Sequence, residues 1–210
     1  MLKWLSLLLG LVGAILLLAV PSASADAPVT GRAGRAEVRF MEGMVDHHQM
    51  ALDMAGHCLP KATTDAVRTL CQAVIEAQTP EIELMRGWLL AWYGIDYAPV
   101  PMATLMEWMG LGTSSGMGMG HGDHTTNPAT DMPLMMGMMA GFDRVEGLDY
   151  DIAWLEAMID HHDDALHMAQ RVLNYAEHED LRALAQRIID DQTAEIAAME
   201  ALLVELAPSG

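Results

Sequence analysis

The sequence contains the stretch Met44-Val45-Asp46-His47-His48 and, 114 residues later, the related stretch Met158-Ile159-Asp160-His161-His162. The same shift, without a gap, then carries Arg68, Leu70, Gln72, Gln78, Thr79, Glu81, Ile82 and Met85 onto Arg182, Leu184, Gln186, Gln192, Thr193, Glu195, Ile196 and Met199. Self-similarity at one fixed shift is the signature of a repeated structural unit. We therefore interpret the chain as two copies of one unit.

Each copy is predicted to be a helical hairpin, because apolar residues recur at helical spacing on both sides of a short polar break. The breaks fall around residues 59–64 and 174–179. Two faces are predicted to point inward, one made of Phe40, Met44, His47, Ala51, Met54, Ala55 and Cys58 and the other of Cys71, Val74, Gln78, Ile82, Met85 and Leu89. Neither hairpin can cover its own apolar face. The sequence thus predicts an all-α four-helix bundle, one domain over residues 38–206, with hairpins at 38–93 and 149–206 related by a pseudo-twofold axis.

The residues outside the hairpins have a different composition. Residues 26–37 are predicted to be a flexible N-terminal segment. Residues 94–148, between the hairpins, are rich in Met, Gly and His and are interrupted by prolines, and Gly112 to Asn127 have too little bulk to form a core. We expect this segment to be a linker laid loosely over the bundle.

The first 25 residues are predicted to be a secretory signal peptide. Lys3 precedes a continuous apolar run, Trp4 to Val20, and Ala23-Ser24-Ala25 matches a small-residue cleavage pattern. The alternative is an uncleaved membrane anchor, since the run approaches the roughly 20 residues that span a bilayer. With cleavage, we expect a periplasmic or secreted protein that is not inserted stably in a membrane.

The net charge excludes some classes of partner and favours others. The formal charge is −18, and removal of the predicted signal, which carries Lys3 and no acidic residue, changes it to −19. This charge repels nucleic acid and favours cations, although an acidic surface also serves solubility alone.

No Glu-x-x-His, C-x-x-C, G-x-G-x-x-G, G-x-x-x-x-G-K-[ST] or H-E-x-x-H motif occurs. The usual di-iron, thioredoxin-like, nucleotide-binding and zinc-protease sites are therefore not predicted.

The paired histidines are the main candidate metal ligands. Adjacent helical residues diverge by about 100°, so His47 and His48 flank the buried direction with Met44 between them, and His161, His162 and Met158 repeat this pattern. A neutral imidazole binds copper, zinc, nickel or iron, and the pseudo-twofold axis can bring the two pairs together. The alternative is that these histidines only hydrogen bond to buried partners such as Gln78 or Gln192.

Methionine supplies a second group of candidate ligands, with 19 in the chain. Its thioether sulfur selects Cu(I), whereas imidazole also suits Cu(II). The linker residues Met117, Met119, His121 and His124 offer both ligand types on a Gly-rich backbone, and we expect them to act as a capture arm. At Met85, Met168 and Met199 the methionine is interpreted first as core filler.

The two cysteines, Cys58 and Cys71, both fall on predicted inward faces. Export permits a disulfide between them. A simple hairpin places Cys71 about two turns beyond the bend, and a disulfide tolerates little stretch. Buried free thiols and metal ligands remain as alternatives.

The doubled histidine motif, together with Gln78-Thr79-Pro80-Glu81-Ile82 and Gln192-Thr193-Ala194-Glu195-Ile196, resembles the secreted domain-of-unknown-function family 305 (DUF305) over about residues 38–205. The resemblance implies a ferritin-like four-helix bundle, and members of the family are linked to copper binding and copper tolerance. The positions that match the family are His47, His48, Met44 and Met54 in one half and His161, His162, Met158 and Met168 in the other. The second pair is followed by Asp163 and Asp164, which departs from the family pattern and puts the equivalence of the two halves in question.

These observations favour a metal-binding protein, with Cu(I) or Cu(II) as the ion, over an enzyme with an organic substrate. We expect it to sequester copper or pass it on, with metal ions as its partners and with a copper-handling protein or a second copy of the chain as candidate protein partners. One alternative is a ferritin-like metallo-oxidase acting on Cu(I) or Fe(II). Another is a structural or interaction module that binds no metal.

Overall fold

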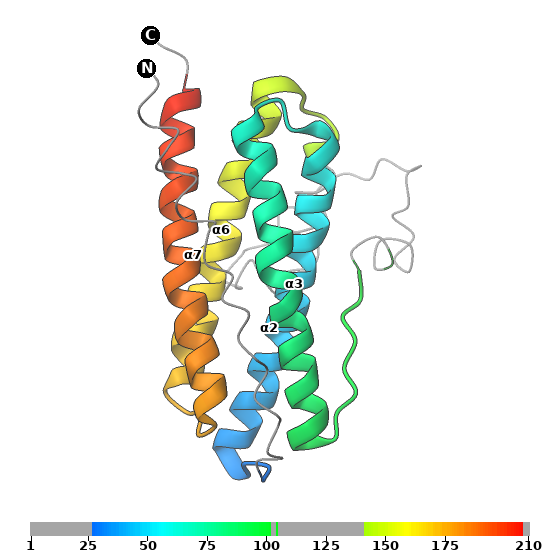
Figure 1. Ribbon diagram of the computed structural model, residues 1–210, viewed down its shortest axis with the longest axis vertical. Coiled ribbons are helices and arrows are strands. Elements are labelled where there is room, and N and C mark those ends of the chain that lie inside the picture. Colours follow the sequence, from blue (N-terminus) through cyan, green and yellow to red (C-terminus); the bar gives the residue numbers. More distant parts are fainter. Residues whose placement is uncertain (1–26, 102–103, 105–140, 208–210) are drawn as a thin grey trace, which may run out of the picture.

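Four long helices make up the computed structural model, which describes residues 27–101, 104 and 141–207 (Figure 1). They are α2 (Gly31–Lys61), α3 (Asp65–Tyr93), α6 (Gly147–Leu173) and α7 (Glu179–Leu206). The predicted signal peptide and the predicted linker ligands Met117, Met119, His121 and His124 lie outside these residues. The predicted all-α class is confirmed, since the described residues form helices and no strand.

The hairpins turn where the sequence predicts. Residues 62–64 connect α2 to α3, and residues 174–178 connect α6 to α7. The hydroxyl of Thr64 caps α3 by accepting a hydrogen bond from the Val67 N–H, and Gly94, with φ of 69°, ends it in the left-handed conformation that suits glycine. Helix α2 begins at Gly31, seven residues before the predicted start of the first hairpin at residue 38, and α6 begins two residues before residue 149. The helical part of the chain is therefore longer than the apolar pattern alone indicates.

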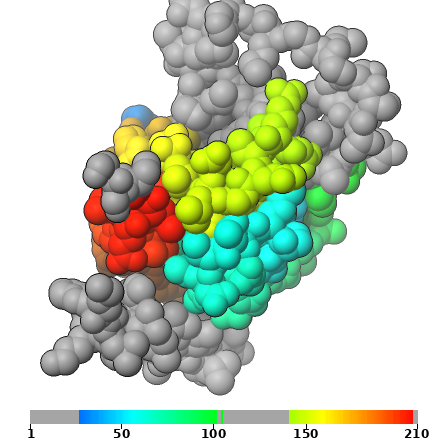
Figure 2. All heavy atoms as spheres, turned by 90° about the horizontal axis from the view of Figure 1, so that it is seen from above, coloured from blue at the N-terminus to red at the C-terminus, as the bar shows by residue number. Residues whose placement is uncertain are grey.

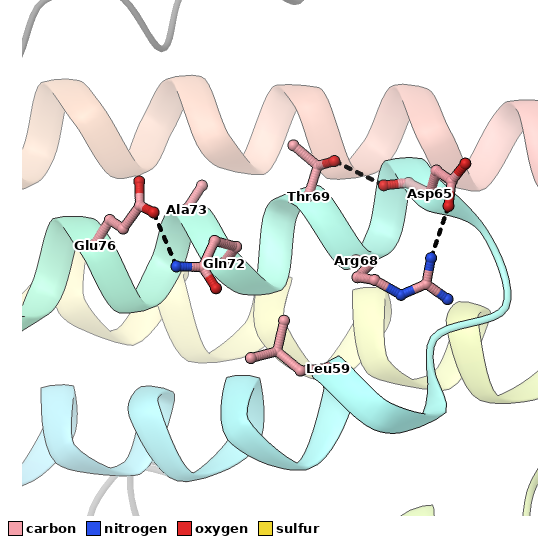
Figure 3. Close-up of a pocket in the computed structure, with 7 residues that line it drawn as sticks. All are labelled: Leu59, Asp65, Arg68, Thr69, Gln72, Ala73 and Glu76. Atoms are coloured by element: carbon pink, nitrogen blue, oxygen red, sulfur yellow. Dashed lines mark hydrogen bonds and ion pairs between the residues drawn. The ribbon is translucent and has the colours of Figure 1, made fainter.

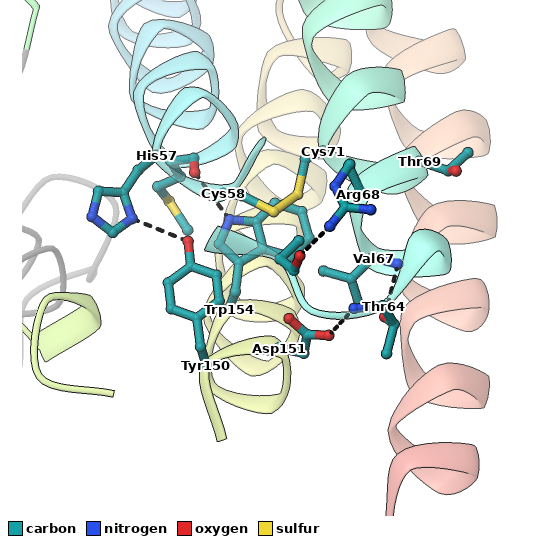
Figure 4. The surroundings of a disulfide bond; sticks show 12 residues. His57, Cys58, Thr64, Val67, Arg68, Thr69, Cys71, Tyr150, Asp151 and Trp154 are labelled. Carbon is teal, nitrogen blue, oxygen red and sulfur yellow. Dashed lines mark hydrogen bonds between the residues drawn. A yellow bond between two sulfur atoms is a disulfide. The ribbon is translucent and has the colours of Figure 1, made fainter. Parts of the chain in front are cut away.

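The two hairpins pack against each other mainly through α2 and α6. All the residues predicted to face inward on α2 and α3 are buried. The indole N–H of Trp154 donates a hydrogen bond to the backbone oxygen of Met54, which joins the hairpins inside the core (Figure 4). Burial of these apolar faces at about 25 cal/mol per Å² is the main force that holds the hairpins together.

Each end of the bundle is closed by a buried carboxylate that holds the turn of the other hairpin. At one end, Asp151 of α6 accepts hydrogen bonds from the backbone N–H groups of Thr63 and Thr64, at 2.9 and 2.8 Å. Figure 2 views this end, where the start of α6 lies against the α2–α3 turn. At the other end, Glu37 of α2 accepts from the N–H groups of the α6–α7 turn, at 2.7 and 3.0 Å. We call these two groups the end clamps.

The two end clamps occupy equivalent positions of the sequence repeat. Residues 37 and 151 are separated by 114 positions, as are the turn residues that they hold, 63 and 64 in one hairpin and 177 and 178 in the other. Glu37 also accepts from the hydroxyl of Tyr93 and from Nδ1 of His178. Burial acts to raise the pKa of Glu37, but the hydrogen bonds from Tyr93 and His178 outweigh it and lower the pKa, so the carboxylate is charged.

The cysteines form a disulfide, which settles the question that their positions in the sequence left open (Figure 4). The Cα atoms of Cys58 and Cys71 are 6.1 Å apart. Cys58 lies three residues before the end of α2 and Cys71 six residues after the start of α3, so the three-residue turn allows their helices to approach at this level. Both side chains are fully buried.

Within the described residues, no helix is sufficiently long and apolar to span a membrane.

Candidate metal centre

His47 and His161 meet at the pseudo-twofold axis. They are equivalent residues of the repeat, and their ring centroids are 3.7 Å apart. Nε2 of His161 lies 3.0 Å from the backbone oxygen of His47. Because a carbonyl oxygen only accepts, this nitrogen carries the proton and donates it. Residues that contact their own repeat equivalents must lie on the axis, as the sequence predicts for this pair.

His48 and His162 point their Nε2 atoms outward to glutamates of the second helix of each hairpin. Nε2 of His48 lies 2.7 Å from the Glu81 carboxylate, and Nε2 of His162 lies 2.8 Å from that of Glu195. Both histidines are fully buried, whereas 21% and 28% of the two glutamate side chains are exposed. The two halves therefore repeat the same imidazole–carboxylate pair, and the difference after the second histidine pair at Asp163 and Asp164 does not alter it.

These contacts differ from the alternative considered for the sequence, in which buried glutamines such as Gln78 or Gln192 satisfy the histidines. Gln78 is buried, yet neither atom of its amide has a hydrogen-bond partner, and the amide oxygen of Gln192 has none either. The partners are Glu81 and Glu195, three residues further along the same helices. Both glutamates belong to the repeat, so their positions can be found in the sequence, but the glutamines lie nearer the centre of the buried helical face.

Ring nitrogens without partners remain on all four histidines. They are both nitrogens of His47 and the Nδ1 atoms of His48, His161 and His162, all of them buried. Burial, and then the charges that neighbouring histidines would carry, hold the pKa of His47 and of His161 well below its usual value. These two rings are therefore neutral at neutral pH, and a neutral ring keeps one lone pair.

Methionines lie beside the histidines along α2 and α6. Met44 and Met158 precede the histidine pairs by three and four residues, which places them on the same helical face, and both are fully buried. Met54 is fully buried as well, whereas its repeat equivalent Met168 is partly exposed. A Cβ atom added at Gly43 would lie 3.3 Å from Cε of Met168, so this methionine packs across the hairpin interface. Soft sulfur and imidazole are therefore both present in this part of the core.

The donor set fits a soft or borderline ion chemically, but the ligands are not assembled. Among the described residues, no three His, Cys, Asp or Glu side chains are arranged so that they could hold one metal ion. The ring centroids of His47 and His161 are only 3.7 Å apart, with the rings tilted by 39°, so an ion does not fit between them. Metal binding at this centre would require these rings to separate.

The outer side of the centre is acidic. Burial, and then the negative charges of Glu81 and Glu195, raise the pKa of Asp191 on α7. Such a group attracts cations to the exposed side of the His48 and His162 pairs.

A surface hollow elsewhere on the protein offers no comparable site (Figure 3). It is lined by Leu59, Asp65, Arg68, Thr69, Gln72, Ala73 and Glu76. Its polar side chains already bond to each other or to nearby backbone, as Arg68 does with Asp65 at 2.7 Å and Gln72 with Glu76 at 2.8 Å. None of the four central histidines lines it.

A family model described as "Domain of unknown function (DUF305)" matches residues 37–203. The chain is a member of the DUF305 family. Solved DUF305 structures share its fold. A putative secreted DUF305 protein from Streptomyces coelicolor is 25% identical, with a TM-score of 0.63 over 83% of this chain and 95% of that one. No curated protein sequence matches the chain significantly.

Structures of a protein called CopM are also similar to this DUF305 chain. The Cu(II)-bound form of CopM is 27% identical, with a TM-score of 0.58 over 80% of this chain and 96% of CopM. The Cu(I)-bound form is 26% identical, with a TM-score of 0.58 over 82% and 98%. The four-helix bundle therefore occurs in a protein that has been solved with copper bound in both oxidation states.

Proposed function

We propose that this DUF305 protein binds copper outside the cytoplasm, and that it sequesters the ion or passes it to another copper-handling protein. His47, His48, His161 and His162 are the inner ligands, and Met44 and Met158 are the adjacent soft ligands. The observation that carries the proposal is the set of buried ring nitrogens without hydrogen-bond partners on all four histidines. A buried polar group without a partner costs about 1–3 kcal/mol, and an ion that accepts these lone pairs would offset that cost.

The chemistry of these ligands favours copper over harder ions. Thioether sulfur is soft and selects Cu(I), and imidazole binds both Cu(I) and Cu(II). The similar protein CopM has been solved with both ions. The proposal of an exported protein rests on the apolar segment at residues 4–20, the Ala23-Ser24-Ala25 pattern and the likeness to a putative secreted protein.

Anaerobic titration with Cu(I) in competition with a chromogenic chelator tests the proposal. We expect the purified protein to compete for Cu(I), and a variant with His47→Asn and His161→Asn to lose most of this affinity. His167→Asn is the matched control, because His167 lies on the same helix as His161 but is exposed and bonds only within its own helix. Equal binding by the wild type and the double variant would refute the assignment of the inner ligands.

The linker methionines and histidines need a separate test. Met117, Met119, His121 and His124 are proposed to capture the ion before it reaches the bundle. Deletion of residues 112–127 should slow Cu(I) uptake from a weak chelator while leaving the final affinity of the bundle unchanged. An unchanged uptake rate would remove the capture arm from the proposal.

Oxygen consumption discriminates this binding function from that of a metallo-oxidase. A binding protein consumes oxygen at most in proportion to the bound Cu(I), whereas an oxidase continues through many turnovers. We expect no sustained consumption with excess Cu(I) or Fe(II).

A further inference from the structure

We infer that Glu81 and Glu195 are positioning residues that hold the proton of His48 and His162 on Nε2, so that Nδ1 is the atom of each ring that binds the metal. The inference deepens the proposed function and depends on it for the identity of the ion. It concerns which nitrogen of each ring is available, and that property can be measured with no metal present.

The hydrogen bonds to the glutamates place the ring proton of His48 and His162 on Nε2. A carboxylate offers only acceptors, so a ring nitrogen at 2.7 or 2.8 Å from it must carry the proton. In a neutral imidazole the other nitrogen then carries the lone pair. The Nδ1 atoms of His48 and His162 are buried and have no hydrogen-bond partner, so in the neutral rings their lone pairs are unoccupied.

The placement of the glutamates supports a positioning role over an accidental contact. The same pair occurs in both halves of the bundle at a sequence separation of 33 residues in each. The glutamates are on α3 and α7 and the histidines on α2 and α6. Each glutamate therefore holds a histidine ring from the other helix of its own hairpin. A carboxylate that receives the second N–H of a ligating histidine orients the ring and raises its basicity, and its removal costs about 10–100-fold in metal affinity.

The glutamates lie at the edge of the core, and the histidine rings that they contact are inside it. The side chains of Glu81 and Glu195 are 21% and 28% exposed, whereas the Nδ1 atoms of the histidines are buried. Each ring thus has its Nε2 atom at a partly exposed carboxylate and its Nδ1 atom in the interior.

The test uses long-range ¹H–¹⁵N spectra of the histidine rings, which distinguish a protonated nitrogen from one with a lone pair. In the metal-free wild-type protein, we expect Nε2 of His48 and His162 to be protonated and Nδ1 to carry the lone pair. Addition of Ag(I), a diamagnetic analogue of Cu(I), should shift the Nδ1 resonances most. A protonated Nδ1 in the metal-free protein would overturn the inference without any variant being needed.

Glu81→Gln supplies the second arm, because the amide has nearly the shape of the carboxylate but can donate as well as accept. We expect a mixture of ring tautomers at His48 and a loss of about 10-fold or more in Cu(I) affinity. Glu83→Gln removes the same charge from the same helix at an exposed residue and should change neither property. An equal loss in both variants would show that only net charge matters and would overturn the inference.

The two proposals fail in different ways. If the wild-type protein binds neither Cu(I) nor Ag(I), the proposed function is wrong, but the tautomers of the metal-free rings still decide the role of the glutamates. If the metal binds and Glu81→Gln has wild-type tautomers and affinity, the proposed function stands and the positioning role is wrong.

Discussion

Replacement of Asp151 by alanine tests whether the end clamps hold the hairpins together. The Asp151 carboxylate is fully buried and accepts the N–H groups of Thr63 and Thr64. Its removal leaves two backbone donors without partners, at about 1–3 kcal/mol each. Thr63 is exposed and Thr64 half-buried, so water can reach these donors in part. Two fully buried donors would cost about 2–6 kcal/mol together, and we therefore expect the free energy of unfolding to fall by about 2–3 kcal/mol, near the lower end.

Urea unfolding with the disulfide intact is the appropriate measurement. Asp149→Ala is the control, because Asp149 is exposed in the first turn of the same helix and contributes only its interaction with the helix dipole, about 0.3–1 kcal/mol. Amide hydrogen exchange should also become faster at Thr63 and Thr64 in the Asp151→Ala variant. Equal destabilisation by the two variants, with unchanged exchange at the turn, would refute the clamp.

Three further predictions follow from the same structure. Below about pH 6.5 the unfolded chain binds protons at His47 and His161 that the folded chain excludes, because burial lowers their folded pKa. This contribution to stability is therefore full above pH 6.5, and below it the free energy of unfolding should fall by up to about 1.4 kcal/mol per group and pH unit. Urea unfolding of the metal-free protein at several pH values measures this dependence. The free energy of unfolding should depend less steeply on pH after His47→Asn and His161→Asn, and an unchanged dependence would contradict the prediction. Reduction of the Cys58–Cys71 disulfide should cost about 2–4 kcal/mol of stability, measured by urea unfolding with and without reductant, and a loss below 1 kcal/mol would count against a native bridge. Gly34→Ala should displace the residues before α2, because the added Cβ would lie 2.0 Å from the backbone oxygen of Val29, and unchanged amide resonances there would contradict the close approach.

The fold could be predicted from the sequence because its two signals reinforce each other. Helical spacing identifies the buried faces, and the repeat requires that two hairpins bury them against each other. The burial of His47 and Gln78 follows from the same faces, although both are polar. The start of α2 was placed too late because Gly31 to Glu37 carries few apolar residues, so nothing in its periodicity marks it as helical.

The end clamps were missed for a different reason. Glu37 and Asp151 occupy equivalent positions of the repeat, but they are different residue types, and a comparison by identity does not pair them. The turns that they hold share no residues either, with Thr63-Thr64 in one hairpin and Glu177-His178 in the other. Their common feature is the backbone N–H group. Every residue except proline provides this group, so the residue types in the turn do not indicate the hydrogen bond.

The pseudo-twofold axis itself explains why unsatisfied nitrogens gather at the centre. A side chain on such an axis faces its own equivalent, so a histidine meets a histidine. The N–H and the lone pair of a neutral imidazole are on different nitrogens and point in diverging directions, so the two rings cannot each donate to and accept from the other. The structure shows the resulting compromise: His161 donates to the backbone of His47, and His47 has no partner in return. Repetition of one hairpin thus places two buried imidazoles together whose ring nitrogens are not all satisfied by the residues that the structure describes. A cation that separated the two rings and accepted a lone pair from each would satisfy both, and this is the role that the proposed copper ion would fill.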